Sequence, residues 1–140
     1  MKIAIINGPN LNLLGKREPD VYGDEGFDAF LDELRRNFPG VEFSYFQSNI
    51  EGELVNALQD FGFRVDGIVL NPAAYTHTSV AIGDAIAAIK APVVEVHISN
   101  VHAREDFRKI SHVSAKVKGT ITGLGLQGYR LAVRWIMREF

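Results

Sequence analysis

A glutamate and a histidine stand two residues apart in the short apolar segment Val93–Ser99, which reads VVEVHIS. Alternate residues of a β-strand point to the same side, so Glu95 and His97 are expected to share one face. A carboxylate beside an imidazole orients the ring and raises its pKa, which prepares a general acid. Ionisable groups inside an apolar strand are costly unless paired or used, so the segment indicates a catalytic dyad or a satisfied structural pair. No third ligand at a recognisable spacing accompanies them, which argues against a metal site.

A second set of reactive side chains lies in a long polar stretch near the N-terminus. Residues 8–23 separate the first apolar segment from the first helical pattern, whereas connections of this kind usually have ~2–6 residues. Arg17 and Tyr22 lie there, and Gly15 and Gly23 could act as hinges of a lid that is mobile without ligand. An arginine beside a tyrosine lowers the pKa of the phenol from ~10, as a tyrosine base requires. The alternative is a surface loop with the arginine in solvent and the tyrosine packed on the rim.

Two further segments supply polar groups. Asn71 ends the third apolar segment, and His77 comes just before an expected helix start, where backbone N–H groups favour an anion or a negative oxygen. The alternative there is a capped turn with a solvated histidine. Residues 102–118 are rich in basic side chains, which mostly suit a solvated face, although an arginine among them could bind a carboxylate. These side chains are His102, Arg104, Arg108, Lys109, His112, Lys116 and Lys118.

The segment Gly123–Gly128 (GLGLQG) matches the dinucleotide-binding pattern G-x-G-x-x-G. It lies in the last strand–helix unit, and the acidic residue expected ~20 positions further on does not follow. We therefore interpret the glycines as a tight turn with close packing. The sequence contains neither a G-x-S-x-G elbow nor a Walker A motif.

These groups must be positioned by strands and helices that alternate along the chain. Short β-branched runs predict strands at Ile3–Ile6, Val41–Phe46, Ile68–Leu70 and Val93–Ile98, with a weaker one at Gly119–Thr122. Helical patterns predict helices over 24–37, after a cap at Asn49, after a cap at Thr78, and from about Gln127. The alternation predicts an α/β fold, a five-stranded parallel sheet of flavodoxin-like order 2-1-3-4-5 with helices on both faces. We expect one catalytic domain over 1–140, with its ligand at the carboxyl ends of strands 1 and 3.

Composition excludes several classes of protein. The net charge is −2 and cysteine is absent, so neither nucleic acid nor an anionic membrane is an expected partner, and disulfides and thiol nucleophiles are excluded. No apolar run approaches the ~20 residues of a membrane-spanning helix. The start, MKIAIINGPN, lacks the apolar region of a secretory signal, so we expect a cytoplasmic location.

In these segments the chain resembles type II 3-dehydroquinate dehydratase. The matching stretches are Asn7–Tyr22 (NGPNLNLLGKREPDVY), Gln47–Leu54 (QSNIEGEL), Asn71–Ala81 (NPAAYTHTSVA), Ala91–Arg108 (APVVEVHISNVHAREDFR) and Gly123–Tyr129 (GLGLQGY). They cover nearly the whole chain in the order of the family. The resemblance implies the third step of the shikimate pathway, the loss of water from 3-dehydroquinate to give 3-dehydroshikimate, without metal, organic cofactor or Schiff-base lysine.

The resemblance also implies catalytic roles. Tyr22 would take a proton from the carbon next to the ketone, with Arg17 lowering its pKa, and Asn10 would hold a water that stabilises the enolate. His97, oriented by Glu95, would then protonate the departing hydroxyl.

Substrate binding and assembly follow from the same resemblance. The substrate's hydroxyls and carboxylate would be held by Asn71, His77, Ile98, Ser99 and Arg108. Asp84 would reach into a neighbouring protomer's site, since family members are typically dodecamers built from trimers. The chain departs from the family pattern at Gly83, where relatives often carry a large residue, and at Ile50, where histidine is common.

Three other functions compete with this one. A flavin carrier of the same fold would have a hydroxyl-rich phosphate loop after strand 1, but residues 8–14 contain no hydroxyl side chain. A phosphoacceptor domain would have carboxylates where Asn7 and Asn71 stand. A catalytically inactive relative that acts only in assembly would not need the tyrosine, arginine and histidines described above.

Overall fold

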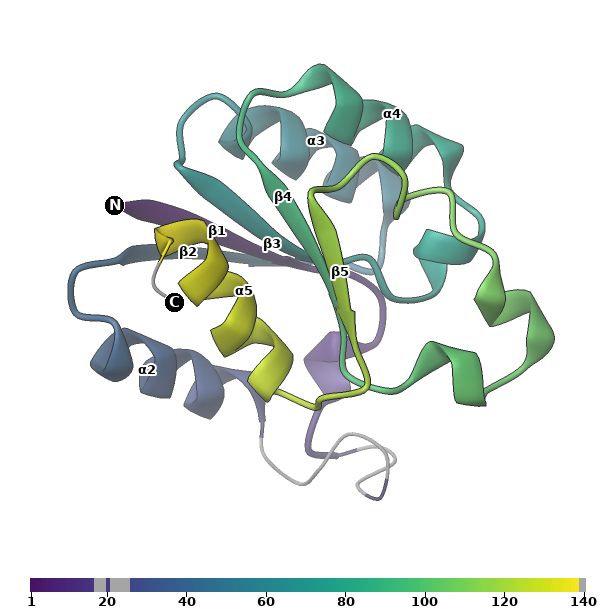
Figure 1. Ribbon diagram of the computed structural model, residues 1–140, viewed down its shortest axis with the longest axis horizontal. Coiled ribbons are helices and arrows are strands. Elements are labelled where there is room, and N and C mark those ends of the chain that lie inside the picture. The colour runs from purple at the N-terminus through teal and green to yellow at the C-terminus, as the bar shows by residue number, and fades with distance from the viewer. Residues whose placement is uncertain (17–19, 21–25, 139–140) are drawn as a thin grey trace.

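Five parallel strands form one sheet in the order β2-β1-β3-β4-β5 (Figure 1). The computed structural model describes residues 1–16, 20 and 26–138. The strands are β1 (Lys2–Asn7), β2 (Glu42–Gln47), β3 (Gly67–Asn71), β4 (Val93–His97) and β5 (Gly119–Thr122). Each lies within about a residue of its predicted position, and the predicted order is confirmed.

Helices cover both faces of the sheet, as predicted (Figure 1). On one face lie α2 (Phe27–Asn37) and α5 (Gln127–Met137), and on the other α3 (Glu51–Phe61) and α4 (Val80–Ala88). Alternation along β1 explains the two cores, because Ile3 and Ile5 pack in the first whereas Ala4 and Ile6 pack in the second. None of the described helices is long and apolar enough to cross a membrane.

Two of the predicted helix caps are wrong by one residue. The side chain of Asn49 does not cap α3 but accepts a hydrogen bond from the backbone N–H of Asn10 at 3.0 Å. It thereby ties the loop after β2 to the loop after β1. At α4, the capping hydroxyl belongs to Ser79, which accepts from the N–H of Ile82 at 3.0 Å, and not to its neighbour Thr78. Of the predicted helix over 24–37, residues 24 and 25 lie outside the described residues.

The glycine-rich segment before α5 is a tight turn, as interpreted from the sequence. Gly123 and Gly125 have φ angles of +86° and +58°, which glycine adopts without steric cost. Their N–H groups donate to the carbonyls of His97 and Ile98 at 3.2 and 3.0 Å. A Cβ at Gly128 would lie 3.0 Å from a methyl carbon of β4, so close packing is also confirmed. The turn holds the carboxyl end of β4 in place.

Residues 110–118, which we call the covering loop, pack against α4. The N–H of His112 donates to the carbonyl of Thr76 at 2.8 Å, and Val113 is fully buried. A Cβ at Gly83 would lie 2.5 Å from the carbonyl oxygen of His112. Glycine inside a helix costs about 1 kcal/mol relative to alanine. Here the missing side chain lets the covering loop approach α4.

Candidate active site

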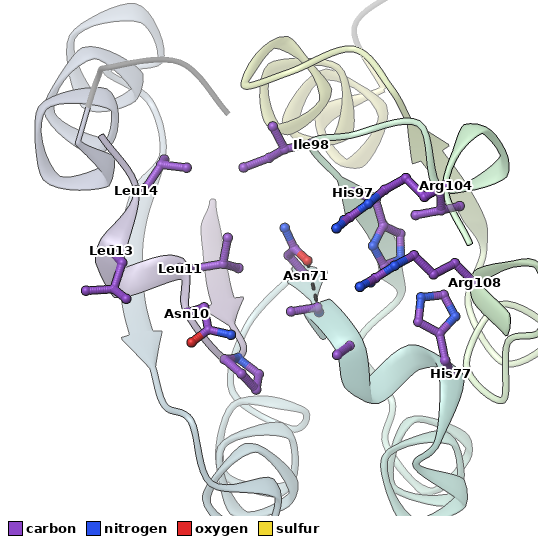
Figure 2. Close-up of a pocket in the computed structure, with 14 residues that line it drawn as sticks. Asn10, Leu11, Leu13, Leu14, Asn71, His77, His97, Ile98, Arg104 and Arg108 are labelled. Carbon is purple, nitrogen blue, oxygen red and sulfur yellow. Dashed lines mark hydrogen bonds between the residues drawn. The ribbon is translucent and has the colours of Figure 1, made fainter. Parts of the chain in front are cut away.

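A pocket opens at the carboxyl ends of β1, β3 and β4, where the fold predicts a ligand site (Figure 2). One of its walls is apolar and is formed by Leu11, Leu13 and Leu14. The opposite wall is polar and cationic, and it contains His77, His97, Arg104 and Arg108. Asn10, Asn71 and Ile98 also line the pocket. A small anion with an apolar side fits such a surface.

Glu95 and His97 form the pair predicted from the spacing on β4. The two side chains are almost fully inside the protein, with 0% of Glu95 and 7% of His97 exposed. The ring Nε2 lies 2.7 Å from the carboxylate Oε2, so the N–H at this position donates to the carboxylate. This bond leaves Nδ1 as the nitrogen that can exchange a proton with a ligand.

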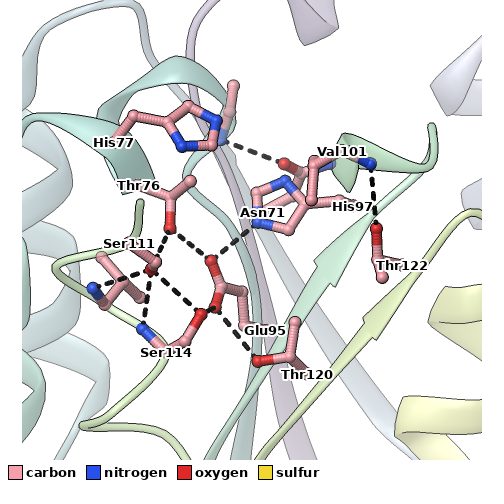
Figure 3. Close-up of polar contacts among 12 residues, drawn as sticks. Asn71, Thr76, His77, Glu95, His97, Val101, Ser111, Ser114, Thr120 and Thr122 are labelled. Carbon is pink, nitrogen blue, oxygen red and sulfur yellow. Dashed lines mark hydrogen bonds and ion pairs between the residues drawn. The ribbon is translucent and has the colours of Figure 1, made fainter. Parts of the chain in front are cut away.

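Three hydroxyl groups also donate to the Glu95 carboxylate (Figure 3). Thr76 donates to Oε2 at 2.5 Å, whereas Ser114 and Thr120 donate to Oε1 at 2.7 and 3.2 Å. Burial alone would raise the pKa of this carboxyl, but the hydrogen bond and charge of His97, with the bonds from Thr76 and Ser114, outweigh burial and hold the pKa below its ordinary value. Glu95 is therefore a buried anion at neutral pH.

His77 lies beside the pair on the same wall. Its Nδ1 donates to the backbone carbonyl of Ile110 at 2.7 Å, and its ring stacks on that of His97 at 6.4 Å between centroids. Burial lowers the pKa of His77, as do the charges of His97 and Arg108, although the bond to Ile110 opposes them. The ring is therefore neutral at neutral pH, and its Nε2 can accept a hydrogen bond from a ligand hydroxyl.

Asn71 is fixed by a buried network that reaches the core. Its side-chain amide donates to the hydroxyl of Tyr129 at 3.0 Å, and that hydroxyl donates to Asn7 at 2.8 Å. The side-chain oxygen Oδ1 of Asn71 accepts from the N–H of Ala73 at 3.0 Å, which supports the positive φ of 53° at Ala73. Burial raises the pKa of Tyr129, so the phenol stays protonated and keeps both bonds.

We expect Tyr129→Phe to lower the free energy of unfolding by about 1–3 kcal/mol, because two buried amides lose their shared partner. Urea denaturation measures this change. Tyr75→Phe is the matched control, since its hydroxyl donates to a carbonyl at the surface and its loss should cost less than about 1 kcal/mol. Equal stability of Tyr129→Phe and the wild type would contradict the role given to this network.

Two arginines face the pocket from the basic segment after β4 (Figure 2). Arg108 pairs through Nε with Glu105 and lies over the ring of Phe107 at 5.0 Å from its centroid. Arg104 donates to the hydroxyl of Ser99 at 3.4 Å. The basic segment left open which of its arginines would bind a carboxylate, and the family resemblance named Arg108 only. The position of Arg104, four residues earlier in the same segment, was the available signal for the second arginine.

Comparisons with known proteins find relatives of this chain among enzymes of one family. The model of the family Dehydroquinase class II matches residues 1–137. The chain belongs to the class II dehydroquinase family.

The 3-dehydroquinate dehydratase of an Exiguobacterium species is 55% identical over 100% of this chain and 97% of its own length. The crystal structure of the type II dehydroquinase from Butyrivibrio crossotus is 44% identical, with a TM-score of 0.94 over 98% of this chain and 97% of that chain. That from Propionibacterium acnes is 43% identical, with a TM-score of 0.89 over 98% of this chain and 96% of that one. The resemblance and the flavodoxin-like fold are thus confirmed.

The other residues predicted for a dehydroquinase site are placed as follows. Ser99 is half-buried next to the pocket, where it contacts Arg104. Asp84 is exposed on α4 and does not line the pocket of its own chain. Arg17 and Tyr22, and with them most of the predicted lid, lie outside the described residues. Within the described part of the chain, no group of three or more histidine, aspartate or glutamate side chains could hold a metal ion.

Proposed function

We propose that this chain catalyses the reversible dehydration of 3-dehydroquinate to 3-dehydroshikimate, the third step of the shikimate pathway to chorismate and the aromatic amino acids. The observation that carries the proposal is the polar wall of the pocket, where His97 is held by a buried anionic glutamate beside two arginines. The reaction removes a proton from the carbon next to a ketone and then expels a hydroxyl group as water. It therefore needs a base, a stabilised enolate and a general acid.

His97 is the general acid of this proposal. Hydroxide is a poor leaving group, so the departing oxygen must be protonated as its bond to carbon breaks. The protonated ring carries a positive charge, which Glu95 stabilises at 2.7 Å. Because Nε2 donates to Glu95, the proton passes from Nδ1 to the hydroxyl, and the ring keeps its orientation after the transfer.

The cationic wall is suited to the substrate's carboxylate and hydroxyls. We assign the carboxylate to the neighbourhood of Arg108, since a guanidinium recognises a carboxylate by charge-assisted hydrogen bonds. Neutral His77 and the amide of Asn71 can bond to hydroxyls, and both are held in position by the contacts described above. Ile98 and Ser99 complete this side at the end of β4.

The base and the enolate stabiliser are assigned through the family. Tyr22 takes the proton, and the charge of Arg17 lowers the pKa of its phenol so that a phenolate forms. Asn10 holds a water that stabilises the enolate, and its position in the pocket wall supports this role.

Assembly and location are further proposals. We propose a dodecamer of four trimers in which Asp84 reaches the site of a neighbouring protomer. The exposed position of Asp84 on α4, away from the pocket of its own chain, supports such a contact. A cytoplasmic location stays a prediction from the sequence.

The direct test is to add 3-dehydroquinate to the purified chain and follow the near-ultraviolet absorbance of the enone product. We expect absorbance to rise in proportion to protein concentration, and a matched His97→Ala preparation excludes a contaminating enzyme if it lacks the activity. A folded wild-type chain without turnover would contradict the proposal and favour an inactive relative.

A further inference from the structure

The carboxylate of Glu95 receives more donors than its place in the strand requires. It is completely buried, and each of its oxygens accepts two hydrogen bonds, from Thr76 and His97 on Oε2 and from Ser114 and Thr120 on Oε1 (Figure 3). Thr120 is the direct partner of Glu95 in the neighbouring strand β5, so the sheet itself brings that hydroxyl close. Ser114 has no such reason to be there, because it belongs to the covering loop.

The covering loop is built to present the Ser114 hydroxyl to the carboxylate. The hydroxyl of Ser111 accepts from the N–H groups of Val113 and Ser114 at 3.1 and 2.9 Å, which fixes the turn. The same oxygen lies 3.0 Å from the hydroxyls of both Thr76 and Ser114, so it connects the donors of the two Glu95 oxygens. The loop also approaches α4 closely at Gly83, where a Cβ would lie 2.5 Å from the carbonyl oxygen of His112.

A donor to Glu95 changes what the carboxylate does to His97. A carboxylate without hydroxyl donors attracts the proton on the imidazole ring strongly. Each hydrogen bond from a hydroxyl group compensates part of that negative charge and weakens the attraction. The hydroxyl bonds stabilise the unprotonated pair more than the protonated pair, in which the imidazolium already compensates the charge. With these hydroxyl hydrogen bonds in place, Glu95 orients the ring of His97 without making the protonated ring too weak an acid.

We propose that Ser114 is a positioning residue for the general acid, whose hydroxyl holds the buried carboxylate of Glu95 and limits its pull on the proton of His97. The inference deepens the proposed function and rests on it for the role of His97 in turnover. It does not concern substrate binding, since Ser114 does not line the pocket. Other charged or titratable groups that lie near the pair are His77, stacked on the ring of His97, and Arg104 and Arg108 of the cationic wall, and none of them is changed in the test.

The test compares Ser114→Ala with Ser114→Thr, which keeps the hydroxyl. The first readout is the pH dependence of carbethoxylation of His97 by diethyl pyrocarbonate, mapped by mass spectrometry, because only the neutral ring reacts. We expect the midpoint in Ser114→Ala to rise by about 0.5–1 pH unit, because a carboxylate that has lost one donor attracts the proton on the ring more strongly. Ser114→Thr should restore the wild-type midpoint. Thr78→Ala, which removes an exposed hydroxyl that does not bond to Glu95, should leave the midpoint unchanged.

The second readout is turnover of 3-dehydroquinate. In Ser114→Ala we expect kcat to fall by about 5–10-fold with KM within about twofold, because the acid is weaker while binding is intact. An unchanged or lowered midpoint in Ser114→Ala, or failure of Ser114→Thr to restore it, would overturn the proposal. If the midpoint rises in Ser114→Ala but the wild-type chain does not dehydrate 3-dehydroquinate, the coupling of Ser114 to the pair is supported and the proposed function is overturned instead.

Discussion

Replacement of His97 by alanine should lower the turnover of 3-dehydroquinate by about 10²–10⁴-fold, the usual contribution of a general acid. In the proposed mechanism the pocket loses the proton donor for the leaving hydroxyl, whereas Arg108 and Asn71, which are proposed to bind the substrate, stay in place. Steady-state kinetics with the near-ultraviolet assay measures the change, and most of it should be in kcat rather than KM.

Glu95→Gln is the companion variant of this experiment. It keeps the shape of the side chain but removes the charge that stabilises the protonated ring, so kcat should fall although His97 is still present. A His97→Ala enzyme with wild-type kcat would show that another group protonates the leaving hydroxyl.

Replacement of Tyr22 by phenylalanine should lower turnover by about 10²-fold or more, with substrate binding largely kept, because the phenolate is the proposed base. Phenylalanine keeps the aromatic ring, and only the hydroxyl is lost. Steady-state kinetics measures the loss in kcat, and equilibrium binding of a carboxylate inhibitor checks that the pocket is intact.

Arg17→Lys serves as the second arm of the tyrosine experiment. Lysine keeps the positive charge but lacks the planar guanidinium, so we expect a large loss of kcat here too. If Tyr22→Phe and Arg17→Lys both turned over at the wild-type rate, the predicted lid would not carry the base.

The strand pattern was sufficient to predict the Glu95–His97 pair. Residues that are two positions apart on a strand point to the same side of the sheet. The structure places Nε2 of His97 2.7 Å from Oε2 of Glu95. The alternation of short apolar runs with helical patterns likewise predicted a parallel sheet, because parallel neighbours need helical crossovers. Right-handed crossovers between five strands then favoured the order that the sheet has. These features depend on local periodicity and on connection rules, which the sequence displays directly.

Features that depend on packing between distant segments could not be predicted in the same way. Ser114 and Thr120 follow Glu95 by 19 and 25 positions. Their hydroxyls reach its carboxylate only because the covering loop places Ser114 there and β5 pairs with β4. Tertiary packing also decides which arginines of a basic segment face a pocket, so the sequence showed Arg104 among the basic residues but did not single it out. The error at α4 has a simpler cause, since Thr78 and Ser79 are adjacent hydroxyl residues and either can cap a helix.

Hydrogen–deuterium exchange of the substrate tests most directly whether the base and the acid are separate groups, Tyr22 and His97. In heavy water the base removes the proton next to the ketone, and the enolate returns deuterium to that carbon if the hydroxyl cannot leave. We expect His97→Ala to incorporate deuterium into 3-dehydroquinate without forming product, and Tyr22→Phe to incorporate almost none. Exchange by Tyr22→Phe as fast as by the wild type, or none by His97→Ala with substrate bound, would contradict this account.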